Sequence, residues 1–162
     1  MKRLLLICIS IFLNHISFAQ NTEGKSDDAA RISIASFVPT DIGSLTPTAQ
    51  EALKGRLDRM ITSNGLGGSS QNRFVLTAKV VEMEKEVSAT TPIVYFYNLE
   101  ITLLIGDVIE GTLFASQVVN VKGIGNSERK AYLNDIKNIK DKDPIYASFL
   151  DKGKQKIVEY YN

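Results

Sequence analysis

The chain has 162 residues, with 19 basic and 18 acidic side chains and a formal net charge of +1. A chain this close to neutrality lacks the strongly basic surface that attracts nucleic acid or anionic lipid, so both classes of partner are disfavoured. It contains one cysteine, one histidine and no tryptophan. Few of the side chains that usually perform nucleophilic catalysis or bind zinc are therefore present.

The first 19 residues have the order of a secretory signal peptide. A short basic start is followed by an apolar run of about ten residues, and Ser17-Phe18-Ala19 places small residues where a signal peptidase cleaves. The apolar run is well short of the roughly 20 residues that span a bilayer. We therefore expect removal of residues 1–19, a mature start at Gln20, export to the periplasm or cell surface, and no transmembrane segment after cleavage.

Cleavage would change the inventory of reactive side chains. The only cysteine, Cys8, and the only histidine, His15, both lie in the leader. Ile7 stands where a small residue would precede a lipidated cysteine, so we do not expect a lipid on Cys8. The leader also removes two basic and no acidic residues, which moves the net charge to −1. Without imidazole or thiol, the mature chain has no Ser-His or Cys-His pair and no ordinary zinc site, which favours a binding module over an enzyme.

The remaining residues suffice for one domain. Residues 20–30 are polar and charged, and they predict a flexible lead-in. Residues 31–162 then predict a single domain, in which residues 139–162 form a C-terminal helical extension.

The domain is predicted to begin with a strand and a helix. Apolar residues alternate from Arg31 to Val38, which predicts a short strand. Thr46-Pro47 suits the cap and first position of a helix, and Asn64-Gly65 its end. Apolar residues recur at helical spacing between these signals: Ala49, Leu53, Leu57, Met60 and Ile61.

Three longer β segments follow: Arg73–Val87, Ile93–Ile105 and Gly111–Lys122. The middle segment alternates most clearly, because every odd-numbered residue in it is apolar or aromatic. The short connections between the three segments imply an antiparallel meander. We expect Ile101 and Leu103 to lie on a helix-covered face of this sheet, with Leu53 and Leu57 packed against it.

Two helices are predicted to complete the domain. One covers Glu128–Ile139, and the other begins at Asp143-Pro144. The second helix carries an apolar stripe of Ile145, Phe149, Ile157 and Tyr161. The predicted order is β-α-β-β-β-α-α. The predicted class is α+β, with a mainly antiparallel four-stranded sheet, helices packed on it and a C-terminal helix.

Glu82, Glu84 and Glu86 are the strongest candidates for chemistry. They alternate along one strand end, so we expect them to project from one face as a row of carboxylates. Such a row suggests a calcium site or the carboxylate pair of a glycosidase-like hydrolase. The alternative is a solvated strand end that Lys85 protects against edge pairing. We favour the alternative, and we expect no catalytic, cofactor-binding or metal-binding residue in this chain.

Two other patterns have weaker functional interpretations. Gly123-Ile124-Gly125 stands between a strand and a helix, but a dinucleotide fingerprint would need a glycine where Glu128 stands. We interpret it as a close turn, with Asn126 or Ser127 as the helix cap. The aromatic run Tyr95-Phe96-Tyr97 resembles a stacking platform, but neighbours on a strand point to opposite faces.

The sequence resembles two groups of exported proteins. Its leader, ending Phe-Ala-Gln, is similar to those of secreted Bacteroidetes proteins. ISIASF at 32–37, LEITLLIGDVIEGTLFASQVVNVKGIGNSERKA at 99–131 and the helix entry at Glu128 are similar to a periplasmic α/β module. That module occurs in the curli-secretion protein CsgG, in the amino-terminal domain of TolB and in lipoprotein activators of penicillin-binding proteins. The resemblance implies an envelope protein and transfers no functional residue to this chain.

Two functions follow as hypotheses. The first is an exported, non-catalytic interaction or assembly module that binds another envelope or cell-surface protein through a sheet edge or a helix face. The second is a small-ligand or calcium-binding protein, or a carboxylate hydrolase, that uses the Glu82, Glu84 and Glu86 end. The missing histidine and cysteine favour the first.

Overall fold

The computed structural model describes residues 32–40, 45–68 and 72–162, and Ile32–Asn162 forms one compact unit. The predictions for the leader and the lead-in concern residues outside these ranges. The elements are β1 (Ile34–Ser36), α3 (Pro47–Ser63), β2 (Phe74–Val87), β3 (Tyr95–Asp107), β4 (Leu113–Gly125), α4 (Glu128–Lys137) and α5 (Pro144–Tyr161). The predicted class and the predicted order of elements are confirmed.

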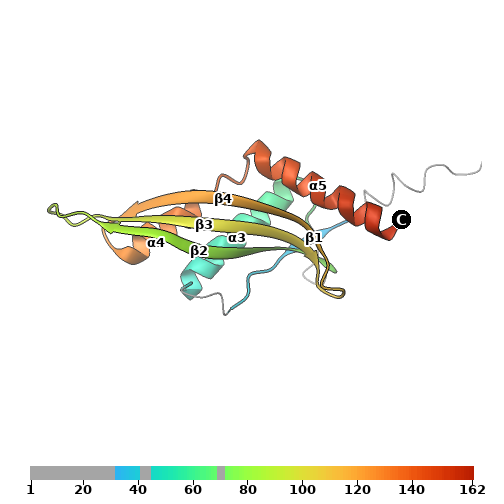
Figure 1. The fold of residues 1–162 in the computed structure, drawn as a ribbon, viewed down its shortest axis with the longest axis horizontal. Helices are drawn as coiled ribbons and strands as arrows, with labels where there is room; N and C mark the ends of the chain where they lie inside the picture. Colours follow the sequence, from blue (N-terminus) through green and yellow to red (C-terminus); the bar gives the residue numbers. More distant parts are fainter. Residues whose placement is uncertain (1–31, 41–44, 69–71) are drawn as a thin grey trace, which may run out of the picture. The chain divides into compact units, whose positions relative to one another are not determined.

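The four strands form one sheet in the order β1-β2-β3-β4 (Figure 1). β2, β3 and β4 pair antiparallel as a meander, as predicted. β1 pairs parallel with the start of β2, so the sheet is mixed. A parallel pair needs a crossover connection, and α3 provides it.

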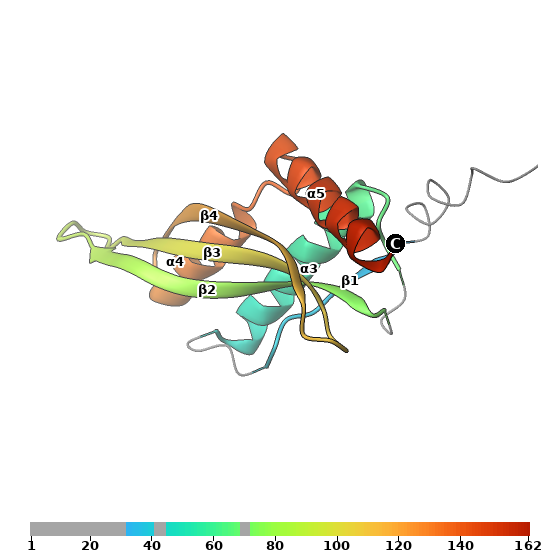
Figure 2. The same ribbon diagram turned by 45° about the vertical axis from the view of Figure 1, so that its right-hand side comes forward.

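One face of the sheet is covered by helices, and we call it the inner face. Figures 1 and 2 show α3 and α4 along this face, with α5 toward the end that holds the β3–β4 turn. The odd-numbered residues of β3 point inward, and Leu99, Ile101, Leu103 and Ile105 have no exposed surface. Leu53 and Leu57 belong to the same buried cluster, which confirms the predicted packing. The opposite side, the outer face, is covered by no helix among the described residues.

Each helix begins at a capping side chain. The Thr46 hydroxyl accepts a hydrogen bond from the Ala49 N–H at 3.3 Å, and Pro47 occupies the first turn of α3. Ser127 and Asp143 cap α4 and α5 in the same way. Ser127 is thus one of the two caps predicted for α4.

Half of the apolar stripe predicted for α5 is buried inside the protein. Phe149 and Ile157 are buried, as are Tyr146 and Leu150, whereas Ile145 and Tyr161 are exposed. Gly153 faces β3 so closely that a Cβ there would overlap Cδ1 of Ile105. Two of the four apolar side chains that the sequence offered to a partner therefore pack in the interior.

The β2–β3 register contains one irregularity, a β-bulge at Met83. Glu82 pairs with Leu99 on the inner face, but Glu84 pairs with Asn98 on the outer face. The extra residue reverses the alternation beyond it. The prediction that three glutamates share one face is therefore wrong: Glu82 points inward, and Glu84 and Glu86 point outward.

Candidate functional site

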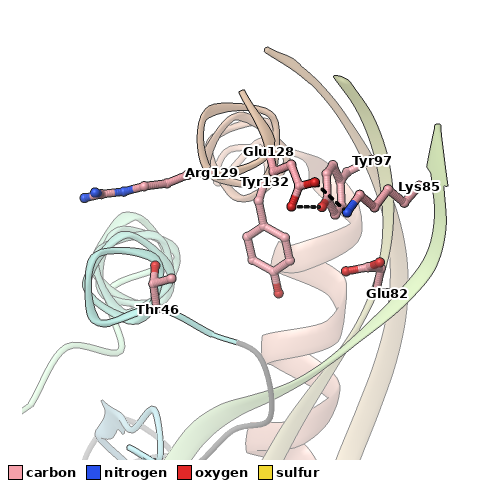
Figure 3. A pocket seen from close by; sticks show the side chains of 7 residues that line it. All are labelled: Thr46, Glu82, Lys85, Tyr97, Glu128, Arg129 and Tyr132. Atoms are coloured by element: carbon pink, nitrogen blue, oxygen red, sulfur yellow. Dashed lines mark hydrogen bonds and ion pairs between the residues drawn. The ribbon is translucent and has the colours of Figure 1, made fainter. Parts of the chain in front are cut away.

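A cavity of about 420 Å³ lies on the inner side of the sheet, and we call it the helix-side cavity. Its walls come from the second half of β2, the start of β3 and the N-terminal ends of α3 and α4 (Figure 3). It is large enough for a small molecule. Its lining side chains are Thr46, Glu82, Lys85, Tyr97, Glu128, Arg129 and Tyr132.

Lys85 and Glu128 form an ion pair across one wall of the cavity. The Lys85 ammonium lies 2.7 Å from Oε1 of Glu128 and 5.7 Å from the centre of the Tyr97 ring. The Tyr97 hydroxyl donates a hydrogen bond to Oε2 of Glu128 at 3.5 Å. The hydrogen bond to Glu128 raises the pKa of Lys85, so the charges of this pair balance at neutral pH. In this wall, the Lys85 ammonium therefore lies between a carboxylate and an aromatic ring.

The opposite side of the cavity has a different charge balance. Glu82 points from β2 toward Tyr132, which projects from α4 into the space between Thr46 and Glu82 (Figure 3). Within residues 32–40, 45–68 and 72–162, Glu82 has no hydrogen bond and no ion pair. Arg129 extends away from Glu82 and donates a hydrogen bond to the Thr48 hydroxyl at 3.1 Å. This side of the cavity therefore presents the carboxylate of Glu82, whose side chain is exposed.

Glu84 and Glu86 lie on the other side of the sheet. They line a separate groove of about 270 Å³ with Phe96, Lys122 and Ile124 among its other residues. In the described part of the chain, no three or more histidine, cysteine or acidic side chains group closely enough to hold a metal ion. The three glutamates therefore do not lie together as a calcium or hydrolase site would require, because Glu82 is on one face of the sheet and the other two are on the opposite face.

The aromatic run at the start of β3 behaves as its alternation predicted. Tyr97 is buried on the inner face, where its ring meets the Tyr132 ring edge-on at 5.8 Å. Phe96 is exposed on the outer face. The run therefore forms no single stacking platform.

The two glycines predicted to form a close turn lie inside β4 instead. Gly123 and Gly125 face α4, and a Cβ at either position would overlap the backbone of Ala131. Their lack of a side chain lets α4 lie directly on the strand. The interpretation of this motif as a turn is therefore wrong, because the turn consists of Asn126 and Ser127 alone.

Asp135 is a buried carboxyl that the sequence analysis missed. It lies on α4 against Gly123 and has no exposed surface. Neither of its carboxyl oxygens has a hydrogen-bond partner among the described residues. Burial raises the pKa of Asp135 to about 7. The spacing of residues could have indicated that Asp135 is buried. Ala131, Asp135 and Ile139 follow one another at intervals of four, and all three are buried.

Asp107 is a second buried carboxyl, at the end of β3. Arg73 Nε lies 2.5 Å from its Oδ2, and the Tyr161 hydroxyl donates to the same oxygen at 2.5 Å. Its Oδ1 accepts the backbone N–H groups of Ile109 and Glu110 at 2.7 and 3.2 Å. Burial alone would raise the pKa of Asp107, but the hydrogen bonds, first among them that from Tyr161, lower it to about 2.

This network fixes a turn whose side chains are apolar and exposed. Val108, Ile109 and Leu113 are 58%, 73% and 59% exposed, and Tyr160 and Tyr161 are exposed beside them on α5. The Phe114 ring contacts the Tyr160 and Tyr161 rings, with centroid distances of 5.6 and 6.3 Å. These contacts join the turn to the end of α5. We call these five exposed residues the apolar end.

Comparison with known proteins adds no family assignment. No protein-family model matches the sequence, and no curated protein matches it. Solved structures that the fold matches include a minor lipoprotein from Acinetobacter baumannii, at 15% identity and a TM-score of 0.40, over 80% of this chain and 91% of that one. A putative lipoprotein from Caulobacter crescentus matches at 11% identity and a TM-score of 0.38, over 85% and 93%. A PelC dodecamer from Paraburkholderia phytofirmans matches at 15% identity and a TM-score of 0.46, over 75% and 87%.

Potential membrane spans were sought in the described ranges. None of the helices there combines the length and the apolar character that crossing a bilayer requires.

Proposed function

We propose that this protein is an exported, non-catalytic interaction module of the cell envelope, and that it docks onto another envelope protein through the apolar end. The observation that carries the proposal is a hydrogen-bonded turn with three exposed apolar side chains. The resemblance of residues 99–131 to the CsgG and TolB module supports the same class of function.

Other surfaces of the fold are less suited to a partner. On the edge strand β4, the carbonyl groups of Lys122 and Ile124 accept hydrogen bonds from Asn138 and Asn134, and Val118 carbonyl accepts from Gln117. A partner strand would have to displace these amides. Beyond its short pairing with β1, the free edge of β2 is charged and bulged, and both features oppose strand addition.

The apolar end has the properties of a preorganised docking surface. A turn usually exposes polar side chains, yet this one exposes valine, isoleucine and leucine. The Asp107 hydrogen bonds, together with Gly111 at φ +68°, hold the turn in one conformation. A rigid surface loses little conformational entropy on binding, and exposed tyrosines are enriched at protein interfaces.

The partner that fits this surface is a protein with an apolar concave site. A membrane surface fits less well, because residues 107–113 include two acidic and no basic side chains. The expected charge of −1 on the mature chain also disfavours anionic lipid.

The docking surface is tested by crosslinking in the envelope of the source organism. The full chain is compared with a variant carrying Val108→Ser, Ile109→Ser and Leu113→Ser. The matched control carries Val87→Ser, Ile93→Ser and Ile124→Ser, which remove three similarly exposed apolar side chains elsewhere. We expect one defined adduct that the first variant loses at least fivefold and the control retains, with unchanged thermal midpoints for both.

Three outcomes would overturn the proposal. One is equal loss of the adduct in both variants, and another is no adduct with any form of the protein. The third is sedimentation with phosphatidylglycerol-containing vesicles that depends on the apolar end. The non-catalytic part is tested separately on a broad hydrolase panel: turnover by the wild type that Glu82→Gln abolishes would contradict it.

A further inference from the structure

We propose that α4 opens from the edge strand β4 as a local unit when the buried Asp135 carboxyl ionises, while the rest of the sheet stays folded. The opening is independent of the docking proposal, since α4 and the apolar end share no residue. Three features of the structure support it: the burial of Asp135 against β4, the absence of a compensating charge in the described ranges, and the exposed hydrogen bonds that attach α4 to the strand.

The first feature is the position of Asp135 between helix and strand. α4 lies so close to β4 that a Cβ at Gly123 would stand 2.2 Å from the Ala131 carbonyl oxygen and 2.8 Å from Cγ of Asp135. The carboxyl group therefore lies against the backbone of the strand, without exposed surface. Neither of its oxygens has a hydrogen-bond donor among the described residues. A neutral carboxyl tolerates this environment far better than a carboxylate, which needs donors or a paired charge when it is buried.

The second feature is the set of titratable side chains on the elements packed against α4, which are β4, β3 and α3. β4 presents none to the helix, because its single charged residue, Lys122, pairs with Asn98 on the outer face. β3 turns two tyrosines toward the inner face, and α3 turns two arginines toward the chain after α4: Tyr95, Tyr97, Arg56 and Arg59. The Tyr97 hydroxyl donates to Glu128, and both arginines are bound to Asp141. The other charged side chains of α4 itself are exposed. Burial accordingly raises the pKa of Asp135 to about 7, with no contribution from a charged neighbour in the described ranges.

The third feature is the attachment of α4 to the rest of the domain. Its Asn134 and Asn138 side chains donate to the carbonyl groups of Ile124 and Lys122 on β4, at 2.8 and 2.7 Å. Both hydrogen bonds are exposed, so water can replace them at little cost. α4 has 10 residues, too few for a helix to persist without its packing. β3, in contrast, is paired on both sides over nearly its whole length. α4 is therefore a unit that can open before the sheet unfolds.

The direction of the effect follows from two pKa values. In the open form Asp135 is solvated and titrates near its ordinary value of 3.8, whereas in the closed form its pKa is about 7. Opening therefore becomes about tenfold more favourable with each pH unit between these values, and it levels off above pH 7. An open α4 leaves the carbonyl groups of Lys122 and Ile124 without the two amides. This part of the edge strand then becomes accessible to a partner strand only after Asp135 has ionised.

The test is hydrogen–deuterium exchange of the purified protein, with the rates corrected for the intrinsic effect of pH. We expect the protection of the α4 amides to fall at least tenfold between pH 5 and 7 and to change less than twofold between pH 7.5 and 8.5. Asp135→Asn, which cannot ionise, should abolish this fall. Asp151→Asn is the matched control, because it neutralises an exposed carboxylate on α5, and it should keep the fall.

Urea separates local opening from unfolding of the whole domain. At pH 7, about 1 M urea should change the exchange of the α4 amides less than twofold and accelerate that of the β3 amides at least threefold, because only unfolding of the sheet exposes a large surface. A second variant, Asn134→Ala with Asn138→Ala, keeps the test independent of how well Asp135→Asn folds. It should lower α4 protection at least threefold at every pH without changing the dependence on pH. The proposal is overturned by α4 exchange as sensitive to urea as that of β3, by equal α4 protection at pH 5 and 7, or by an Asp135→Asn variant as pH-dependent as the wild type.

Discussion

Asp107 and Asp135 lie toward opposite ends of the sheet, and both are almost completely buried. Asp107 accepts hydrogen bonds from Arg73, Tyr161 and two backbone N–H groups, and its pKa falls to about 2. Asp135 has no such partner among the described residues, and burial raises its pKa to about 7. Burial is therefore common to both carboxyls, and hydrogen bonding decides which of them is ionised.

The two carboxyls make stability depend on pH in opposite directions. The folded pKa of Asp107 lies below its ordinary value of 3.8, so its contribution is complete above about pH 4 and is lost as pH falls toward 2. The folded pKa of Asp135 lies above 3.8, so its contribution is complete below about pH 4 and is lost as pH rises through 7. From these two groups together, stability is greatest near pH 4.

The largest expected effect comes from removing Asp107. Asp107→Ala leaves Arg73 and two backbone N–H groups without their acceptor, so the free energy of unfolding at pH 7 should fall by about 2–4 kcal/mol. Urea denaturation at pH 7 measures this free energy of unfolding. Glu110→Ala is the control, because it removes only the exposed partner of Arg73 and should cost less than about 1 kcal/mol. Equal losses in the two variants would mean that the buried network contributes nothing.

A smaller effect of opposite sign is expected at Asp135. Asp135→Asn cannot ionise, so it should raise the free energy of unfolding at pH 8 by about 1–3 kcal/mol and leave it unchanged at pH 4. Denaturation between pH 4 and 8 should show a decline in the wild type that the variant lacks. Asp151→Asn, at an exposed position on α5, should keep the wild-type decline. A variant as pH-dependent as the wild type would show that Asp135 titrates normally.

The smallest effect is expected for one hydrogen bond to Asp107. Tyr161→Phe removes the donated O–H and keeps the ring contacts with Phe74 and Phe114, so it should cost about 1 kcal/mol. The pKa of Asp107 should also rise, which shifts the loss of stability at acid pH to higher pH. Tyr160→Phe is the neighbouring control and should change neither quantity. Thermal melts from pH 2 to 7 compare the variants.

The sequence predicted the elements well because local signals marked them. Alternation across Ile93–Ile105 predicted β3 and its buried face, and capping residues such as Thr46 predicted the helix starts. The sequence did not show that Phe149 and Ile157 are buried in the core. An apolar stripe has the same pattern whether it packs against the core or against a partner.

The sequence predicted the site poorly because its geometry depends on contacts between distant residues. The Met83 bulge interrupts a perfect alternation of charges, and no glycine or proline marks it. Asp107 and Asp135 were passed over because a carboxylate is normally solvated, although both continue a buried periodicity. The roles of Gly123 and Gly125 required knowing how closely α4 approaches β4.

The bulge at Met83 also decides on which face of the sheet the charged side chains after it lie. Met83 is the extra residue, and the residues after it keep the pairs Glu84–Asn98, Lys85–Tyr97 and Glu86–Phe96. Deletion of Met83 would therefore remove the bulge and leave Glu84 and Glu86 on the outer face and Lys85 on the helix side. If Met83 instead paired regularly opposite Asn98, these three side chains would change faces without any of them being altered, so the bulge decides the charge pattern of both faces.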